Sequence, residues 1–182
     1  MTRRSGTLES SIERVLGELR REYWRSIESA PTDEPMTEQV LLMSSGGELY
    51  ALHAGQAREV ARPGDIVPLP GAPDRLAGVT NVRGQAVPVL DLRRVIEGRP
   101  SDLGPSARLV TLRSPLPIAI LVEAVSDLVE VAMADLLGAI QVAPAEAGGD
   151  GRPARGTLTV PGGLEARLLD VDRLIELASG QS

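Results

Sequence analysis

Short apolar runs separated by turn residues fill the chain from residue 40 to residue 169. Val, Leu and Ile make up the runs, and clusters of Gly, Pro, Asp and Ser divide them. This alternation is typical of a mainly β protein built as a barrel or sandwich. It predicts two groups of strands, divided by a polar break near residue 100, and a helical turn at 132–137. The expected strands are 40–43, 48–53, 57–61, 78–82, 85–92, 108–112, 117–122, 127–131, 140–142, 156–160 and 164–169, with 66–69 extended.

Two hairpin turns are expected within this pattern. Ser44-Ser45-Gly46-Gly47 separates the first two strands, and Arg83-Gly84 separates a later pair. Gly in such a turn supplies the positive φ that a tight hairpin requires. Pro88 lies inside the second strand of the later pair. Because proline cannot donate to a strand ladder, Pro88 predicts a sheet edge or a bulge.

Helices are expected at both ends of the chain. Residues 7–29 repeat apolar side chains at three- and four-residue steps, which predicts an amphipathic helix followed by a linker at 30–38. This arm packs on its own body, associates with a second helix, or binds a partner through Tyr23 and Trp24. At the other end, Asp170 or Asp172 is expected to cap a short helix.

Composition narrows the classes of function. The net charge is −6, every cation is Arg and aromatic residues are 2% of the chain, so nucleic-acid binding is not expected. The absence of Cys excludes disulfides, thiolate metal sites and Cys nucleophiles. The apolar run at 116–122 is far shorter than the roughly 20 residues that cross a bilayer. The start of the chain has no apolar signal core, so we expect a cytoplasmic protein without membrane insertion.

Residues suited to catalysis are scarce. His53 is the one His, with no acidic or nucleophilic neighbour nearby in sequence, and it is interpreted as structural. A triad assembled across the fold stays open, although no G-x-S-x-G elbow supports it. Asp170 and Asp172 fit helix capping better than acid–base chemistry. The Gly-rich stretch 148–151 lacks the adjoining strand and Lys of a phosphate loop. We therefore expect no catalytic residues, no cofactor and no metal site.

The most informative stretch is residues 69–93, LPGAPDRLAGVTNVRGQAVPVLDLR. It predicts a proline-fixed approach, a hairpin with Arg83 at its tip and a strand that ends in Asp-Leu-Arg. An Arg in a turn is usually solvated. A planar guanidinium beside an apolar strand can instead hold a carboxylate through two parallel hydrogen bonds. The residues alone leave both interpretations open.

This stretch resembles the CheW family, the coupling proteins of bacterial chemosensory arrays. The family pattern Gly-Val-x-Asn-Leu-Arg-Gly followed by Pro-x-x-Asp-Leu-Arg is similar to GVTNVRG at 78–84 and PVLDLR at 88–93. The resemblance covers residues 38–178. It implies two SH3-like five-stranded β-barrel subdomains that flank a hydrophobic groove, with 1–37 as an additional arm and linker. It also implies that the protein has no catalytic activity.

The resemblance further implies partners and a binding site. Family members bridge the cytoplasmic tips of methyl-accepting chemotaxis receptors to the histidine kinase CheA, so both are expected partners, at membrane-associated arrays. The Arg of the family motif pairs with a Glu after the second strand, and breaking such a pair is costly only if it is buried. Gly55 and Ala57 replace larger aliphatics of the family, which predicts an altered receptor surface. The matching residues are Glu59, Val79, Asn81, Val82, Arg83, Gly84 and Val87, with the three valines expected in the groove.

Three functional hypotheses follow from these patterns. The favoured one is a non-catalytic adaptor between chemoreceptors and a CheA-type kinase. The second is the same scaffold in a chemosensory-like pathway that controls development, attachment or a second messenger. The third is a small β-barrel enzyme or ligand-binding module that uses His53 and acidic residues.

Overall fold

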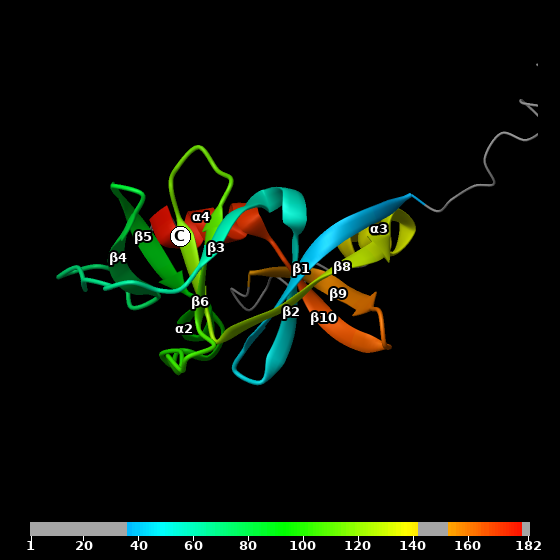
Figure 1. Ribbon diagram of the computed structural model, residues 1–182, viewed down its shortest axis with the longest axis horizontal. Coiled ribbons are helices and arrows are strands. Elements are labelled where there is room, and N and C mark those ends of the chain that lie inside the picture. Colours follow the sequence, from blue (N-terminus) through cyan, green and yellow to red (C-terminus); the bar gives the residue numbers. More distant parts are fainter. Residues whose placement is uncertain (1–35, 142–152, 180–182) are drawn as a thin grey trace, which may run out of the picture. The chain divides into compact units, whose positions relative to one another are not determined.

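The computed structural model describes residues 36–141 and 153–179, and in this part of the chain ten strands form two five-stranded sheets (Figure 1). The first sheet, in the order β8-β1-β2-β10-β9, contains β1 (Thr37–Ser45), β2 (Glu48–His53), β8 (Ala124–Ala132), β9 (Ala154–Val160) and β10 (Leu164–Leu169). The second, in the order β3-β6-β7-β5-β4, contains β3 (Ala57–Ala61), β4 (Leu76–Val82), β5 (Gln85–Asp91), β6 (Arg108–Leu112) and β7 (Ala119–Val122). The expected mainly β fold with two five-stranded units is confirmed. The predicted helix at 7–29 lies outside the described residues.

The prediction that the two units divide near residue 100 is wrong. The chain builds β1 and β2, forms the whole second sheet from residues 57–122, and then returns to the first sheet. The return depends on a parallel pairing of β10 with β2, in which Arg167 lies opposite Tyr50. A parallel pairing needs a long connection and leaves no local turn signal, so the strand pattern along the chain did not show it.

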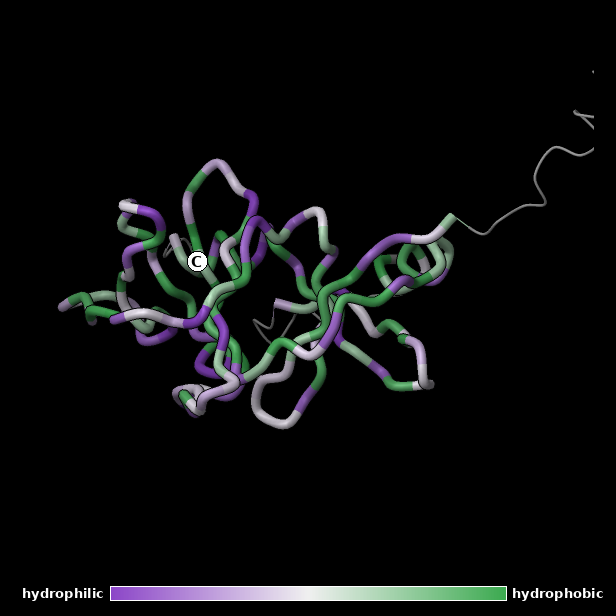
Figure 2. The backbone as a smooth tube through the Cα atoms, in the orientation of Figure 1, coloured by the Kyte–Doolittle hydropathy of each residue, from purple (hydrophilic) through white to green (hydrophobic). Residues whose placement is uncertain are grey.

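Many of the strands bury side chains on both faces, which explains their continuous apolar runs (Figure 2). On β1, Val40 and Leu42 pack in a cluster of the first sheet, while Leu41 and Met43 pack in a cluster shared by both sheets. Successive side chains of a strand point to opposite faces, so β1 contributes to two clusters at once. The shared cluster includes Leu41, Met43, Tyr50, Leu52, Leu90, Val110, Leu112, Ile120 and Leu169. A third cluster, within the second sheet, consists of Val87, Val89, Leu109, Ala119 and Leu121.

The segment that follows β3 lies against the outer edge of β4. Val67 and Val79 exchange two backbone hydrogen bonds of 2.8 Å, and the Thr80 hydroxyl donates to the Asp65 carbonyl at 2.8 Å. Gly78 permits this approach, because a Cβ at that position would lie 2.2 Å from the Val67 carbonyl oxygen. The segment thus satisfies backbone groups that an edge strand would otherwise expose.

Both predicted hairpins form, with β1 paired to β2 and β4 paired to β5. Pro88 was expected at a sheet edge or a bulge, yet β5 lies between β7 and β4 in the strand order. The pairing of β5 with β7 begins only at Val89. Pro88 therefore occupies the part of β5 that has no β7 neighbour, where its missing N–H interrupts no bond to that strand.

Three helices and one short 3₁₀ segment, η1 (Ala54–Gln56), complete the described part of the chain. The expected C-terminal helix is confirmed as α4 (Val171–Ser179), and Asp170 caps it by accepting from the Arg173 backbone N–H at 3.2 Å. Asp91 caps α2 (Leu92–Glu97) in the same way. The predicted strand at 140–142 is wrong, because α3 (Met133–Gln141) continues through 140 and 141. Burial of Leu136 and Ala139 on one face of α3 favours this helix.

Candidate protein-binding site

The turn between β4 and β5 is built from two residues with positive φ. Val82 pairs with Gln85, and the intervening Arg83 and Gly84 have φ of 52° and 85°. Such a turn suits the twist of a hairpin but strains a residue with a Cβ. The Asn81 side-chain oxygen accepts a hydrogen bond of 2.7 Å from the Gly84 N–H. Asn81 and Gly84 therefore hold Arg83 in a conformation that an Arg rarely adopts.

Arg83 at this turn meets Glu59 on β3. Arg83 Nε donates to Glu59 Oε2 at 2.8 Å, and the two side chains are 77% and 26% exposed. This is one hydrogen bond to one carboxylate oxygen, and not the pair of parallel bonds that the sequence left open as one of two interpretations. Because β3 and β4 stand at opposite ends of the strand order, the ion pair joins one outer strand to the turn that follows the other. Its exposure places it among pairs worth at most about 1 kcal/mol.

The three valines expected in a groove differ from one another in burial. Val87 is only 2% exposed and packs in the cluster of the second sheet, and Val82 packs against that cluster. Val79 is half-buried and bridges to Val67. The alternation of β4 and β5 turns Thr80 and Val87 to the same face, which is the buried one. Val82 and Val87 therefore pack beneath the turn, whereas Val79 lies on the opposite face of β4.

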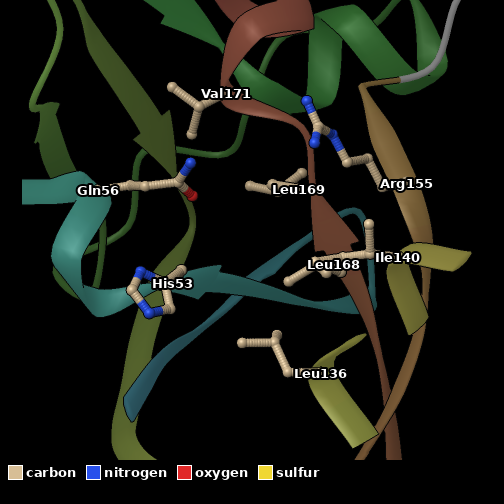
Figure 3. A pocket seen from close by; sticks show the side chains of 8 residues that line it. All are labelled: His53, Gln56, Leu136, Ile140, Arg155, Leu168, Leu169 and Val171. Atoms are coloured by element: carbon tan, nitrogen blue, oxygen red, sulfur yellow. The ribbon is translucent and has the colours of Figure 1, made fainter. Parts of the chain in front are cut away.

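A pocket of about 160 Å³ lies elsewhere, beside the end of β2 (Figure 3). Its walls are mostly aliphatic, with three polar side chains among them. The lining residues are His53, Gln56, Leu136, Ile140, Arg155, Leu168, Leu169 and Val171. Sequence reasoning missed this site, since residues 140–142 were predicted as a strand and the contributing elements are far apart in the chain.

His53, on the pocket wall, is paired with a carboxylate. Its Nε2 lies 2.9 Å from Glu38 Oε2, and the pairing of β1 with β2 brings the two residues together. Glu38 is the one side chain bonded to this ring among the described residues. A triad also needs a nucleophile bonded to the imidazole. The interpretation of His53 as a hydrogen-bonded structural residue fits this geometry.

Arg155 is the cation of the pocket wall, and two carboxylates engage it. Its Nε and Nη2 lie 2.7 Å and 2.9 Å from the two oxygens of Asp170, and Nη2 lies 3.1 Å from Asp172. The hydrogen bond to Asp170 raises the pKa of Arg155. Burial by itself raises the pKa of Asp170, but hydrogen bonds from Arg155 and the Arg173 backbone outweigh it and lower that pKa. The positive charge of Arg155 is therefore compensated by Asp170 and Asp172. The pocket thus suits an apolar side chain.

Two further observations concern metal binding and membrane spanning. Within residues 36–141 and 153–179, no group of three or more His, Cys, Asp or Glu could hold a metal ion. No helix in the same part of the chain is long and apolar enough to cross a membrane.

Known proteins are similar to this chain in sequence. Protein FrzA of Myxococcus xanthus is 33% identical over 124 residues, which cover 66% of this chain and 74% of FrzA. Chemotaxis protein CheW of Treponema pallidum (strain Nichols) is 27% identical over 81 residues, and the match spans less than half of each protein, 44% of this chain and 46% of that one.

The fold also matches a solved structure. The scaffolding protein TtCheW from Thermoanaerobacter tengcongensis aligns with a TM-score of 0.63 and 21% identity, over 74% of this chain and 89% of TtCheW. The family described as the CheW-like domain matches residues 39–179. The resemblance seen in the motif is thereby confirmed, and this chain belongs to the CheW-like domain family.

Proposed function

We propose that this protein is a non-catalytic adaptor that couples the cytoplasmic tips of chemoreceptors to a CheA-type histidine kinase. The match of residues 39–179 to the CheW-like domain carries the proposal. The relatives named chemotaxis protein CheW and scaffolding protein TtCheW support it. A place at membrane-associated receptor arrays follows from the same proposal.

The turn at Asn81–Gly84 is the first proposed contact surface. Arg83 is exposed, yet Glu59 and the Asn81–Gly84 hydrogen bond fix its position. A guanidinium held in place loses less conformational freedom on binding than a free one. Val82 and Val87 would act by packing beneath the turn and holding it in place.

The pocket beside His53 is the second proposed contact surface, for an apolar side chain of a receptor helix. An apolar cavity of about 150 Å³ holds one benzene ring, so this pocket has room for one large aliphatic side chain. Burial of one such side chain contributes about 1.5–3 kcal/mol, which is too little for tight binding alone. An adaptor of this kind would therefore depend on several linked contacts within an array.

Reconstitution tests the proposal. The full chain is mixed with the soluble kinase and with receptor tips attached to neutral lipid vesicles, and bound protein and kinase activity are measured after sedimentation. We expect the chain to sediment with receptor vesicles and to raise kinase activity. Arg83→Ala should lower the stimulation several-fold. A wild-type chain that binds neither receptor nor kinase would overturn the proposal.

The same scaffold in a chemosensory-like pathway outside motility is the second candidate. It is favoured by one observation, that the relative aligned over 124 residues is named FrzA and not CheW. Deletion of the gene separates the two candidates. Loss of swimming responses supports the motility pathway, whereas normal swimming with altered attachment or development supports the alternative.

A further inference from the structure

The chain passes from the second sheet back to the first through a single residue, Glu123. β7 ends at Val122 and β8 begins at Ala124, so no loop separates two strands that belong to different sheets. The Glu123 N–H donates to the Ser44 carbonyl at 3.1 Å, which ties the crossing to the end of β1. The backbone of Glu123 is thus held on the side of the first sheet.

The carboxylate of Glu123 accepts hydrogen bonds from both sides of this crossing. Its Oε1 accepts from Arg93 Nη1 at 2.8 Å, and Arg93 lies on α2, which directly follows β5 of the second sheet. Its Oε2 accepts from the Gly46 N–H at 3.1 Å, in the turn between β1 and β2 of the first sheet. Each oxygen of one carboxylate therefore holds a different sheet. The groups of Arg93, Glu123 and Gly46 are here called the Glu123 clamp.

The Glu123 clamp is partly buried, and its cation is held from a second direction. The side chains of Arg93 and Glu123 are 27% and 22% exposed. Arg93 Nε donates to Glu97 Oε2 at 3.0 Å, so α2 itself orients the guanidinium. This hydrogen bond raises the pKa of Arg93, and the charges of both carboxylates add to the effect. Since partly buried charges are screened less than exposed ones, the clamp keeps its attraction at physiological salt.

The clamp adds a directional constraint to a core that has none of its own. The two sheets share an apolar cluster, to which Leu41 contributes from the first sheet and Leu90 from the second. The hydrophobic effect is non-directional, whereas a hydrogen bond weakens steeply as its angle closes. The shared core therefore holds the sheets together, and the clamp favours one orientation between them.

We infer that the Glu123 clamp fixes the orientation of the two sheets and thereby keeps the two proposed contact surfaces at a constant separation. The second half of this inference rests on the proposed function. The turn at Asn81–Gly84 belongs to the second sheet, whereas the pocket lies beside β2, β9 and β10 of the first. Two sites held at a fixed separation raise each other's effective concentration for a matching assembly. Glu123 is thus a positioning residue, which matters when both surfaces are engaged together.

Glu123→Gln breaks the clamp with almost no change in side-chain volume. A Gln side chain has one acceptor oxygen and one donor nitrogen, so it cannot accept from both Arg93 and Gly46. Arg93→Gln is a second variant, which removes the cation instead of the carboxylate. The matched control is Glu130→Gln, which makes the same change at an exposed position of β8. Glu130 forms no side-chain hydrogen bond or ion pair within residues 36–141 and 153–179.

Distances between spin labels test the orientation without any partner. The chain has no Cys, so Ala86→Cys and Glu165→Cys place one label at an exposed position of each sheet. We expect one narrow distance distribution in the otherwise unchanged chain and in Glu130→Gln. The distribution should be at least about twofold broader in Glu123→Gln and Arg93→Gln, because non-directional packing then remains. Thermal unfolding of each variant shows whether it is folded, and Arg93→Gln decides if Glu123→Gln is not.

Reconstitution with both partners tests the consequence for the adaptor. Kinase stimulation is measured with receptor tips on neutral vesicles, and binding to the receptor and to the kinase is measured separately. We expect Glu123→Gln to bind each partner alone like wild type but to lower stimulation about three- to fivefold, since joint binding depends on a fixed separation. Glu130→Gln should match wild type in all three measurements.

Several results would overturn the inference. They are an unchanged narrow distribution in the folded clamp variants, equal broadening in Glu130→Gln, and weaker binding of Glu123→Gln to one partner alone, which would make Glu123 a contact residue. Broadening with normal kinase stimulation would refute the consequence for the adaptor. If wild type binds neither receptor nor kinase, the proposed function itself fails, and the spin-label distances still decide the role of the clamp.

Discussion

Arg83 and Glu59 are joined by an ion pair of 2.8 Å that links the β4–β5 turn to β3, at opposite ends of the strand order of one sheet. The pair is exposed on the Arg side and half-buried on the Glu side. Its geometry costs strain, since Arg83 has a φ of 52°. A strained and weakly stabilising arrangement of this kind contributes little to stability and is consistent with the proposed contact role of Arg83.

Replacement of Arg83 by Gly should separate stability from function. Gly adopts a positive φ without strain, which stabilises the folded protein. It also removes the ion pair and gives the unfolded chain more conformational freedom, which are destabilising, so these effects offset one another. We expect the free energy of unfolding in urea to change by less than about 1 kcal/mol. Kinase stimulation should nevertheless fall several-fold. A variant that loses both stability and stimulation would make Arg83 a structural residue.

A double-mutant cycle on Arg83→Ala and Glu59→Ala should give a coupling energy below about 1 kcal/mol in unfolding measurements. The coupling should shrink further when salt is added, because exposed charges are screened. A larger, salt-insensitive coupling would contradict the exposed geometry of the pair.

The close approach of Gly156 to α3 predicts a sensitive position. A Cβ on Gly156 would lie 1.9 Å from the Ala139 carbonyl oxygen, so Gly156→Ala should destabilise the protein by about 1–3 kcal/mol. Gly138→Ala is the matched control, because Gly138 lies inside α3 with no atom near its missing Cβ. That control should be neutral or stabilising by up to about 1 kcal/mol. Urea unfolding of both variants checks the prediction.

Asp91 is a buried carboxylate that accepts hydrogen bonds from several donors. It is 2% exposed and accepts from the Arg94 N–H, the Ser101 N–H and the Ser101 hydroxyl. Asp91→Ala should lower the free energy of unfolding by about 2–4 kcal/mol, since it removes a helix cap and leaves polar groups unpaired. Asp135→Ala, at an exposed position in the first turn of α3, should change it by less than about 1 kcal/mol. Equal changes in the free energy of unfolding for the two variants would contradict the role of Asp91 as a helix cap and hydrogen-bond acceptor.

The lowered pKa of Asp170 predicts how stability responds to acid. Its pKa is lower in the folded protein than its ordinary value of about 3.9. The unfolded chain therefore takes up a proton first, and the stabilisation present at neutral pH is lost as pH falls below about 4. Asp170→Asn should be less stable than wild type at pH 7, and the difference should narrow at pH 3. A constant difference across this range would exclude the ionised carboxylate as the cause.

The local sequence was enough to predict the hairpins, most strands and the family, and it limited the cap of α4 to Asp170 or Asp172. Gly46, Gly47 and Gly84 favour tight turns because glycine adopts positive φ without strain, and apolar runs favour strands through burial. The pairing of Arg83 with Glu59 was expected only through the family resemblance. Its exposure, which sets its energy, depends on neighbours that no sequence pattern reports.

Tertiary structure alone decided the parts that depend on distant contacts. The parallel pairing of β10 with β2 joins the last strand to the start of the first sheet, and the pocket gathers side chains from six elements. Leu136 and Ile140 line that pocket only because α3 is helical through residue 141. Local patterns report which residues are buried or turned, because those preferences act over a few residues. Which surfaces meet is decided by the packing of the whole chain, and so the pocket could be found only in the folded structure.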